Sequence, residues 1–492
     1  MEKFKRFVKY FVFVLVLIPS IFMLSACNIV INSRNIVGIE KTSTNGLVDT
    51  YTITYSDNTT STFTVTNGRN GYDGKDAQSV TINQIYNALV ERGYTKSFDE
   101  FLKEYLSLEI KTSDKTASIN TAILSSVSVY SEFQVITQEP VGFFGTKDVK
   151  TTSVSAGSGV IYKLDKEKGD AYIITNYHVV YNEEGVNSKI GTTRVFLYGS
   201  LVNVAYKTDA NGNYVYNTNG YPIVEYSNDA IECEYVGGSL NYDIAVLKIT
   251  NNSLLKNSSA RQVTISDEYV VGDTAIAIGN PEAEGISVTE GIVSVESEYI
   301  TMTGADEKTT VTFRTLRIDT AINSGNSGGG LFNEHGELIG IVNAKIVDSE
   351  IENIAYAIPK DIALNVADNL IYNFEKSATN KVYKITVGLT LTINASRAEY
   401  NESTKTTKIV EQVAISSVTA GSVGESAGFK VNDQLKSITI NDTTYKVNRM
   451  FNAIDLALKI KVGDNVVYTV MRDGVETKIS FTANAVNFGY AD

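Results

Sequence analysis

Short runs of apolar and β-branched residues, separated by turns rich in Gly, Asn and Asp, dominate the chain from about residue 120 to residue 358. Little of this region shows the three-to-four-residue spacing of an amphipathic helix. So many short strands predict an antiparallel barrel or a pair of barrels. The strands are expected at 159–162, 171–175, 244–249, 274–278, 286–295, 311–318, 337–342 and 353–358.

The pattern before this region is different. In residues 28–70, Thr alternates with Val, Ile, Tyr and Phe, which predicts a β-hairpin. Residues 67–79 form a glycine-rich linker, and residues 81–108 have helical spacing. This region is interpreted as a stalk, with a small independent binding module as the alternative.

Helices return after the strand-rich region. A helical run begins at Pro359, which suits a first helical turn, and continues to about residue 375. The last hundred residues mix strands with helices near 423–428 and 450–460, which predicts a compact α+β module.

Length and composition favour a globular protein of several domains. The chain has 492 residues, of which 43% are hydrophobic, and this length predicts two to four domains. The net charge is −13, or −16 without residues 1–26, which carry +3. Such an acidic surface argues against a nucleic-acid partner.

The N-terminus has the features of an export signal. Four basic residues precede the apolar run from Phe11 to Leu24, which is followed by Ser25-Ala26-Cys27. Leu-Ser-Ala-Cys resembles the lipobox of bacterial lipoproteins, in which the cysteine is lipidated and becomes the first residue. The alternative is an uncleaved signal anchor. Cys233 is then left without a partner, which excludes a disulfide framework and predicts a small apolar strand residue.

The segment Gly325-Asn326-Ser327-Gly328-Gly329 is a candidate nucleophile loop. Glycines on both sides of a serine allow a substrate carbonyl to approach the hydroxyl, and they allow backbone N–H groups to face an oxyanion. The motif alone is weak, because glycine-rich turns match it by chance. It requires a base and an acid elsewhere in the chain.

Only two histidines are available as the base. His178 follows an apolar strand, whereas His335 lies in a turn and is interpreted as a surface residue. Asp243 stands at the start of another apolar strand, where its carboxylate can accept the imidazole N–H and fix the tautomer. The order His178, Asp243, Ser327 is that of the chymotrypsin-like double barrel and excludes an α/β-hydrolase.

Seven segments, taken together, resemble the HtrA/Deg family of trypsin-like serine proteases. They are AGSGVIY (156–162), TNYHVV (175–180), YDIAVLKI (242–249), AIAIGNP (275–281), SVTEGIVS (287–294), RIDTAINSGNSGGGL (317–331) and IAYAIP (354–359).

The resemblance implies roles for the candidate residues. His178 is expected to be the general base, Asp243 its orienting partner and Ser327 the nucleophile, with the N–H groups of Gly325 and Ser327 as the oxyanion hole. His178 and Asp243 are 65 positions apart, which exceeds the family's usual spacing because of an inserted hairpin at 199–230.

The same resemblance bears on the specificity pocket. A preference for Lys or Arg requires a carboxylate about six residues before the nucleophile, and Ala321 stands there. The residues that match the pocket are Ile322, Ile346 and Ile354. A small or medium apolar side chain is therefore expected before the scissile bond, although each isoleucine is also a plausible barrel core residue.

Residues 380–485 resemble the PDZ domain that is fused to HtrA proteases. Such a domain binds an extended peptide as an added strand and holds its terminal carboxylate on loop N–H groups. Gly388, Leu389, Thr390 and Leu391 match that loop, but Thr390 replaces the family's second glycine. A docking module without a free peptide ligand is the alternative.

The expected fold is therefore mainly β: a chymotrypsin-like double β-barrel protease, an α+β PDZ domain and a small N-terminal β-hairpin and helical stalk. The expected division is a lipoprotein signal peptide (1–27), the hairpin, linker and stalk (28–115), the protease domain (116–376) and the PDZ domain (380–485).

The expected function is that of an exported serine endopeptidase, lipid-anchored to the outer face of the bacterial cytoplasmic membrane, that degrades misfolded or damaged proteins. Unfolded polypeptides and peptide C-termini are the expected partners, and the family implies a homo-oligomer, a trimer. No cofactor and no metal site is expected, because two histidines and two cysteines cannot form a zinc cluster. The alternative is a chaperone-like or scaffolding protein that binds unfolded chains without turnover.

Overall fold

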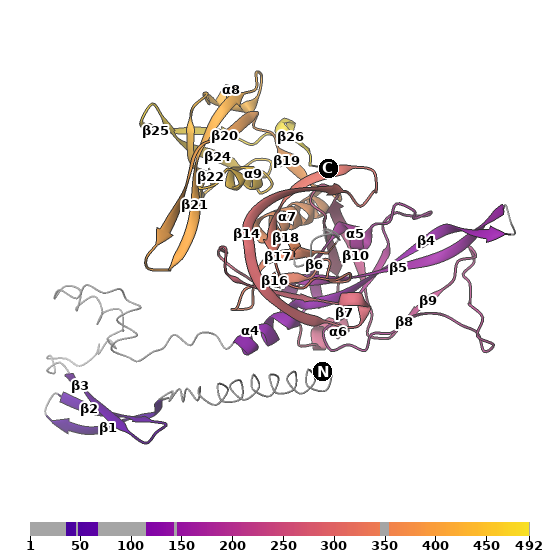
Figure 1. Ribbon diagram of the computed structural model, residues 1–492, viewed down its shortest axis with the longest axis horizontal. Helices are drawn as coiled ribbons and strands as arrows, with labels where there is room; N and C mark the ends of the chain where they lie inside the picture. The colour runs from indigo at the N-terminus through magenta and orange to yellow at the C-terminus, as the bar shows by residue number, and fades with distance from the viewer. Residues whose placement is uncertain (1–35, 46–47, 67–114, 142–144, 345–353, 492) are drawn as a thin grey trace, which may run out of the picture. The chain divides into compact units, whose positions relative to one another are not determined.

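The computed structural model describes residues 36–45, 48–66, 115–141, 145–344 and 354–491 (Figure 1). The chain divides into two compact units, residues 1–108 and 109–492. The predicted signal peptide with Cys27, the predicted linker and helical stalk, and Ile346 lie outside the described residues. None of the helices in the described part of the chain is long and apolar enough to cross a bilayer.

In the first unit, the Thr-rich segment forms a three-stranded antiparallel sheet of β1 (Ile36–Asn45), β2 (Val48–Tyr55) and β3 (Thr60–Thr66). The turn between β2 and β3 depends on Asn58, whose φ of 61° is in the left-handed region that Asn tolerates. The sequence predicted the hairpin of β2 and β3, and the structure adds β1 as a third strand.

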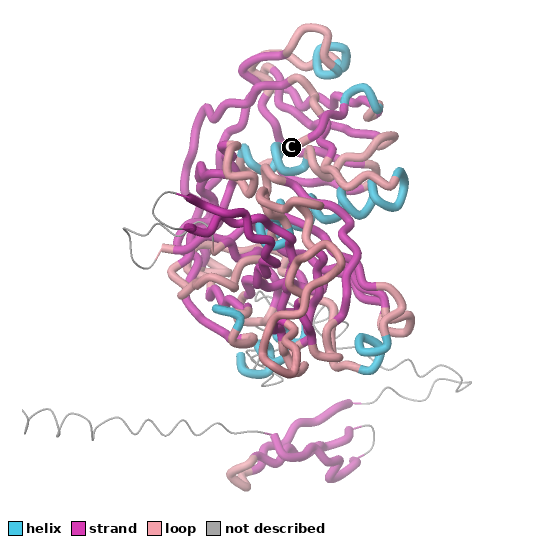
Figure 2. The backbone as a smooth tube through the Cα atoms, turned by 90° about the vertical axis from the view of Figure 1, so that its right-hand side faces the viewer, coloured by secondary structure: helices cyan, strands magenta, loops and turns pink. Residues whose placement is uncertain are grey.

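The second unit consists mostly of strands, as Figure 2 shows. Six of them close into the first barrel in the order β10-β11-β6-β5-β4-β7. They are β4 (Ser126–Val141), β5 (Gly145–Asp165), β6 (Asp170–Thr175), β7 (Thr192–Leu197), β10 (Ile231–Ser239) and β11 (Ile244–Ile249). Their buried Val, Ile and Leu side chains, such as Val127, Ile173 and Leu247, fill the barrel interior.

The second barrel is formed by a sheet with the strand order β12-β17-β16-β13-β14-β15-β18. The sheet closes on itself because β17 also pairs with β18. Its strands are β12 (Thr264–Ile265), β13 (Thr274–Gly279), β14 (Ser287–Thr303), β15 (Thr310–Ile318), β16 (Gly330–Phe332), β17 (Glu337–Asn343) and β18 (Ala355–Pro359). The predicted double barrel and the mainly β fold class are confirmed.

Four helices accompany the barrels: α4 (Lys115–Ala122), α5 (Tyr177–Val180), α6 (Ser253–Asn257) and α7 (Lys360–Ser377). Pro359 is the N-cap of α7, so the helix begins one residue after it. The apolar side of α7, including Ile362, Val366 and Leu370, packs into the large core that the two barrels share. The helix thereby covers apolar strand residues that would otherwise face water.

The strands β4 and β5 continue beyond the first barrel as a long two-stranded arm. The insertion at 199–230 contains a short antiparallel pair, β8 (Val204–Tyr206) and β9 (Val224–Tyr226), and it packs on this arm. Thr152 in the arm makes two hydrogen bonds to the insertion. Its hydroxyl donates to the carbonyl of Pro222, and its backbone carbonyl accepts from the hydroxyl of Tyr206. The insertion therefore has its contacts on the arm.

The C-terminal module is an α+β unit whose main sheet has the order β20-β21-β22-β24-β25, with β23 beside β22. Its strands are β19 (Tyr383–Ile385), β20 (Leu389–Asn401), β21 (Thr406–Val418), β22 (Gln434–Ile440), β23 (Thr443–Lys446), β24 (Asn465–Arg472), β25 (Val475–Thr482) and β26 (Phe488–Tyr490). The helices are α8 (Val423–Ala427) and α9 (Met450–Leu456). The second helix is shorter than predicted, because the N–H groups of Leu458 and Lys459 bond to carbonyls three residues back and tighten the chain into turns.

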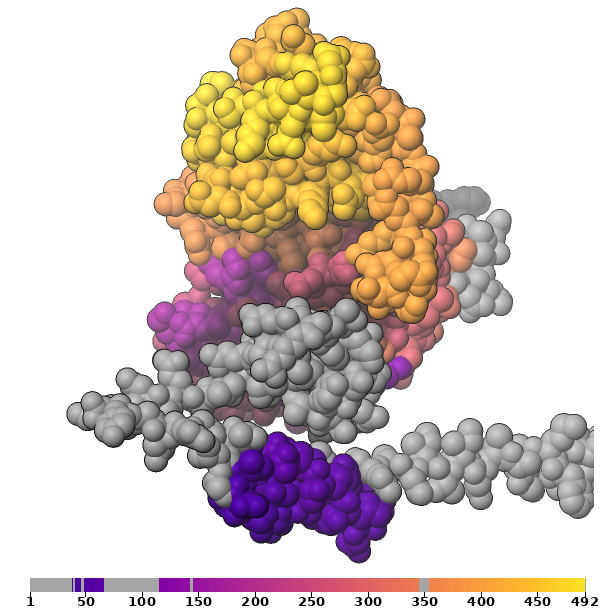
Figure 3. Space-filling model, turned by 90° about the vertical axis from the view of Figure 1, so that its left-hand side faces the viewer, coloured from indigo at the N-terminus to yellow at the C-terminus, as the bar shows by residue number. Residues whose placement is uncertain are grey.

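The module belongs to the same compact unit as the barrels (Figure 3). Arg314 of β15, only 1% exposed, pairs with Asp455 of α9 at 2.6 Å and lies 4.0 Å from the ring centre of Phe451. Asn365 of α7 donates to the Asp455 carbonyl at 3.3 Å. A buried pair of this kind is costly to break from one side, at about 3–5 kcal/mol.

Candidate active site

His178 lies on α5, a single helical turn that follows β6. Val179 and Val180 are buried in the first barrel and fix the turn, while the His178 side chain remains 19% exposed. An apolar strand that ends in a short helix thus presents one imidazole at the barrel surface.

Asp243 lies in the turn between β10 and β11, with φ of 49°. Its carbonyl accepts hydrogen bonds from the Asn176 side chain at 2.8 Å and from the N–H of Tyr177 at 3.2 Å. Its carboxylate Oδ1 accepts the backbone N–H of His178 at 2.9 Å. The turn that carries Asp243 is therefore tied to the segment that carries His178.

The two residues continue into a hydrogen-bonded relay with Ser327. Nδ1 of His178 is 2.6 Å from Oδ2 of Asp243, and Nε2 of His178 is 2.9 Å from Oγ of Ser327. A carboxylate only accepts, so Nδ1 carries the proton in this pair and Nε2 is left to accept from the serine hydroxyl. The first barrel supplies the base and the acid, and the second supplies the serine.

Asn343, at the end of β17, also contacts the relay, and the sequence analysis did not predict this contact. Its Nδ2 donates to Oδ2 of Asp243 at 2.8 Å, and the residue is fully buried. This oxygen consequently receives two donors, Asn343 and His178. The one sequence feature that could have indicated this role is that Asn343 is the single polar residue at the end of the otherwise apolar run LIGIVN.

The loop before Ser327 is shaped by glycine and held by the first barrel. Gly325 has φ of 91°, and a methyl group on it would lie 2.2 Å from the Asn280 carbonyl oxygen. The Gly325 carbonyl accepts the Ser158 hydroxyl at 2.7 Å, and the Ser327 carbonyl accepts the Ser158 N–H at 2.8 Å. Within the described residues, the N–H groups of Gly325 and Ser327 have no hydrogen-bond acceptor.

Comparisons with known proteins find similarity to serine proteases. Residues 157–341 match the family model of the trypsin-like peptidase domain. The serine protease Do-like HtrA of Lactococcus lactis subsp. lactis (strain IL1403) is 28% identical over 382 residues, which cover 73% of this chain and 80% of that protein. The protein of the same name from Bacillus subtilis (strain 168) is 28% identical over 375 residues, covering 74% and 71%.

This chain is a serine endopeptidase with a trypsin-like peptidase domain, and it is similar to serine proteases of HtrA type. Among solved structures, the HtrA-type protease AlgW with a decapeptide is 21% identical, with a TM-score of 0.42. That comparison covers 77% of this chain and 99% of the other.

The residues expected to form the specificity pocket of the peptidase have different environments. Ala321 is exposed in the loop before the nucleophile, and its carbonyl accepts the Thr289 hydroxyl at 2.8 Å. Ile322 is partly buried against the core of the second barrel, and Ile354 is partly buried just before β18. Ile322 therefore has the core contact that the alternative interpretation predicted for it.

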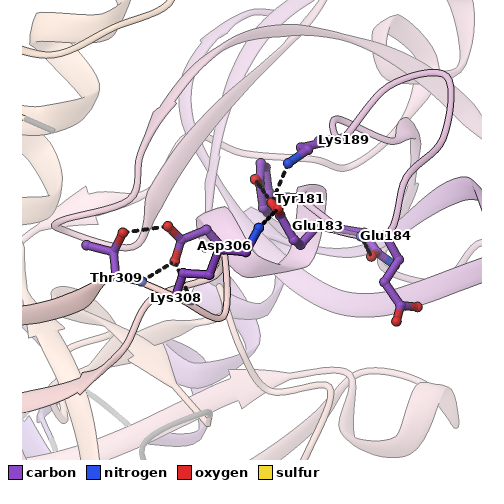
Figure 4. A network of polar contacts seen from close by, with 8 residues as sticks. Tyr181, Glu183, Glu184, Lys189, Asp306, Lys308 and Thr309 are labelled. Carbon is purple, nitrogen blue, oxygen red and sulfur yellow. Dashed lines mark hydrogen bonds and ion pairs between the residues drawn. The ribbon is translucent and has the colours of Figure 1, made fainter.

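A polar network centred on Glu183 links the loop after α5 to the second barrel (Figure 4). Its carboxylate accepts the Tyr181 hydroxyl at 2.6 Å, the Lys189 ammonium at 2.6 Å and the ammonium of Lys308, in the turn between β14 and β15. Hydrogen bonds from Lys189, Lys308 and Tyr181 lower the pKa of Glu183 to about 2. The loop that follows His178 is thereby linked to the second barrel over the whole physiological pH range.

A groove of about 660 Å³ lies in the C-terminal module between the start of β20 and helix α9. Gly388, Leu389, Thr390 and Leu391 line one side, as the sequence suggested for a peptide-binding loop, and Met450, Ala453, Ile454 and Ala457 line the other. Within the described residues, β20 pairs with β21 alone in the main sheet, so its outer edge has no strand partner there on the groove side.

Proposed function

We propose that this chain hydrolyses peptide bonds in misfolded or damaged exported proteins by acyl-enzyme chemistry. Ser327 is the nucleophile, His178 the general base and Asp243 the residue that orients the imidazole. The observation that carries the proposal is the unbroken relay from Asp243 through His178 to Ser327, at 2.6 and 2.9 Å. Both contacts are within the range required for proton transfer and orientation.

The first step is attack of the Ser327 hydroxyl oxygen on the scissile carbonyl carbon while Nε2 of His178 takes the hydroxyl proton. The ion pair with Asp243 stabilises the imidazolium. When the C–N bond breaks, His178 returns the proton to the departing amine and leaves an acyl group on Ser327. A water molecule, deprotonated by His178, then attacks the acyl carbon; the ester bond to Ser327 breaks, and His178 returns the proton to the Ser327 oxygen.

The negative charge that develops on the carbonyl oxygen is stabilised by the N–H groups of Gly325 and Ser327. Support for this role comes from the shape of the loop: Ser158 accommodates the Gly325 carbonyl, and both N–H groups lack an acceptor within the described residues. Preorganised donors of this kind contribute about 2.7–4 kcal/mol each to transition-state stabilisation.

Cleavage should follow small or medium apolar residues. Ala321 offers no charge to a Lys or Arg side chain, and a cation buried among Ile322, Ile346 and Ile354 would remain unpaired. Replacing Ile322 by alanine should extend cleavage to larger side chains without abolishing activity. Cut sites in an unfolded protein test this, and cleavage mainly after basic residues would contradict the assigned pocket.

The C-terminal module acts as a PDZ domain that regulates the peptidase and binds extended peptide C-termini. The open edge of β20 and the apolar wall of α9 support addition of a peptide strand, and Gly388 at φ of 80° opens the loop toward a carboxylate. Binding of an apolar-ended peptide, but not of its C-terminal amide, is the expected result in fluorescence anisotropy.

Lipidation of Cys27 places the enzyme on the outer face of the cytoplasmic membrane, and the enzyme assembles as a homotrimer. The lipid proposal rests on the Leu-Ser-Ala-Cys sequence that ends the signal, and the trimer rests on resemblance. Two acyl chains would be needed for stable attachment, because one gives only marginal binding.

The competing function is a chaperone-like protein that binds unfolded chains without cleaving them. Incubation of the mature chain and its Ser327→Ala variant with casein separates the two functions. Rapid fragmentation by the parent and none by the variant is expected. Equal binding without fragmentation by the parent would establish the competing function instead.

A further inference from the structure

The last described strand, β26, connects the C-terminal module to the barrels. It pairs with β19 in the register Tyr383 with Tyr490 and Ile385 with Phe488. The N–H of Ala491 donates to the Val382 carbonyl at 3.0 Å and continues this ladder by one residue. The strand therefore follows the segment that leads out of α7.

The side chains of this segment enter two different cores. Phe488 packs in the core of the C-terminal module, whereas Ala491 packs against the large core of the barrels, which includes Val382. The ring of Tyr490, the residue before Ala491, lies 4.8 Å from the ring of Tyr383. Packing on both sides fixes the position of the Ala491 carbonyl.

That carbonyl accepts a hydrogen bond from Nδ2 of Asn241 at 2.6 Å. Asn241 is two residues before Asp243, in the link between the end of β10 and the left-handed turn that carries the carboxylate. A non-glycine residue at positive φ costs free energy, and it persists only where its surroundings determine the conformation. The Asn241 bond joins the chain two residues before this position.

We propose that Asn241 is a positioning residue, through which residues 490–491 hold the turn of Asp243 in its productive conformation. Among the described residues, Asn241 makes no hydrogen bond to the imidazole or to the nucleophile, so it acts on the relay through the backbone that leads to Asp243. The inference rests on the proposed role of Asp243. Replacement of Asp243 by asparagine tests that role separately, since it should abolish turnover whatever Asn241 does.

The test compares Asn241→Ala with Asn365→Ala. Both remove a side-chain amide that donates to a backbone carbonyl of the C-terminal module, but Asn365 is on α7 and contacts Asp455. For a short chromogenic peptide, Asn241→Ala should lower kcat about three- to tenfold with KM unchanged, and Asn365→Ala should leave kcat within twofold. Phosphonylation of Ser327 by a small fluorophosphonate should slow by the same factor as kcat.

A second variant that ends at Gly489 removes the Ala491 carbonyl and keeps Phe488 in its core. It should reproduce the kcat of Asn241→Ala, and the combined variant should be no slower than either, because both remove the same hydrogen bond. Thermal unfolding of all variants identifies losses that follow from stability alone. The proposal would be overturned if Asn241→Ala and Asn365→Ala had equal kcat, or if Asn241→Ala changed only KM. It would also be overturned if the combined variant lost the sum of the two single losses.

Discussion

Replacement of Asn343 by leucine, a side chain of similar size without a donor, tests whether the buried amide supports the catalytic relay. In the parent, Oδ2 of Asp243 receives Nδ2 of Asn343 at 2.8 Å and Nδ1 of His178 at 2.6 Å. After the replacement only the histidine remains on that oxygen. The carboxylate is then free to rotate away from the orientation in which it holds the imidazole.

The size of the effect follows from the kind of hydrogen bond that is lost. A bond to a charged group contributes about 1.5–3 kcal/mol. The His178 backbone N–H still holds the other oxygen at 2.9 Å, so the relay is weakened but not dismantled. At 1.36 kcal/mol per tenfold change, kcat/KM should fall about 10- to 150-fold, chiefly through kcat.

The assay is steady-state cleavage of a short peptide amide, with unfolding measured in parallel. Thr193→Val is the control, because it also removes a buried hydrogen bond, to Ser131 at 2.9 Å, but within the first barrel. This control should lose stability and keep its kcat. An Asn343→Leu enzyme with kcat within twofold of the parent, or one that slows only as much as Thr193→Val, would refute the reasoning.

Three other outcomes are expected. Ser327→Ala, His178→Ala and the double variant should lose turnover to nearly the same extent, since the members of a relay act as one unit; additive losses measured in kcat would contradict this. Because Glu183 has a folded-state pKa of about 2 against an ordinary value of 4.5, its bonds stabilise the fold above pH 4.5 and are lost as the pH falls toward 2. The stability of Glu183→Gln should therefore fall less than that of the parent between pH 4.5 and 2. A stability curve parallel to the parent's over this range would show that the Glu183 bonds do not stabilise the fold. Mass spectrometry of the native N-terminus should find a diacylglyceryl group on Cys27; an unmodified cysteine or another cleavage site would exclude it.

Much of the barrel and of the relay could be predicted because the signals are local. Alternation of apolar residues marks strands such as β6 and β11, and a chain with two histidines leaves little choice of base. The insertion at 199–230 lengthens the chain between His178 and Asp243. Its contacts with Thr152 explain how it can be accommodated without separating the relay.

The supporting contacts could not be predicted, because they depend on how distant segments close on one another. Asn343 meets Asp243 across 100 residues, and Asn241 meets Ala491 across 250. Neither amide lies in a motif, and each would be an ordinary strand-end or turn residue if its partner were elsewhere. The extension of β4 and β5 beyond the barrel was missed for a related reason: strand pairing, not local sequence, determines where a strand ends.

The hydrogen bonds from Ser158 to the nucleophile loop have a consequence for the newly made chain. A folded first barrel alone would hold His178 and Asp243 but no serine, and the second barrel alone would hold Ser327 without the contacts that fix the Gly325 carbonyl. Peptide-bond hydrolysis can therefore begin only after the two barrels have docked. Newly made copies are themselves unfolded chains, and this sequence of events delays their ability to digest one another until they have ceased to be substrates.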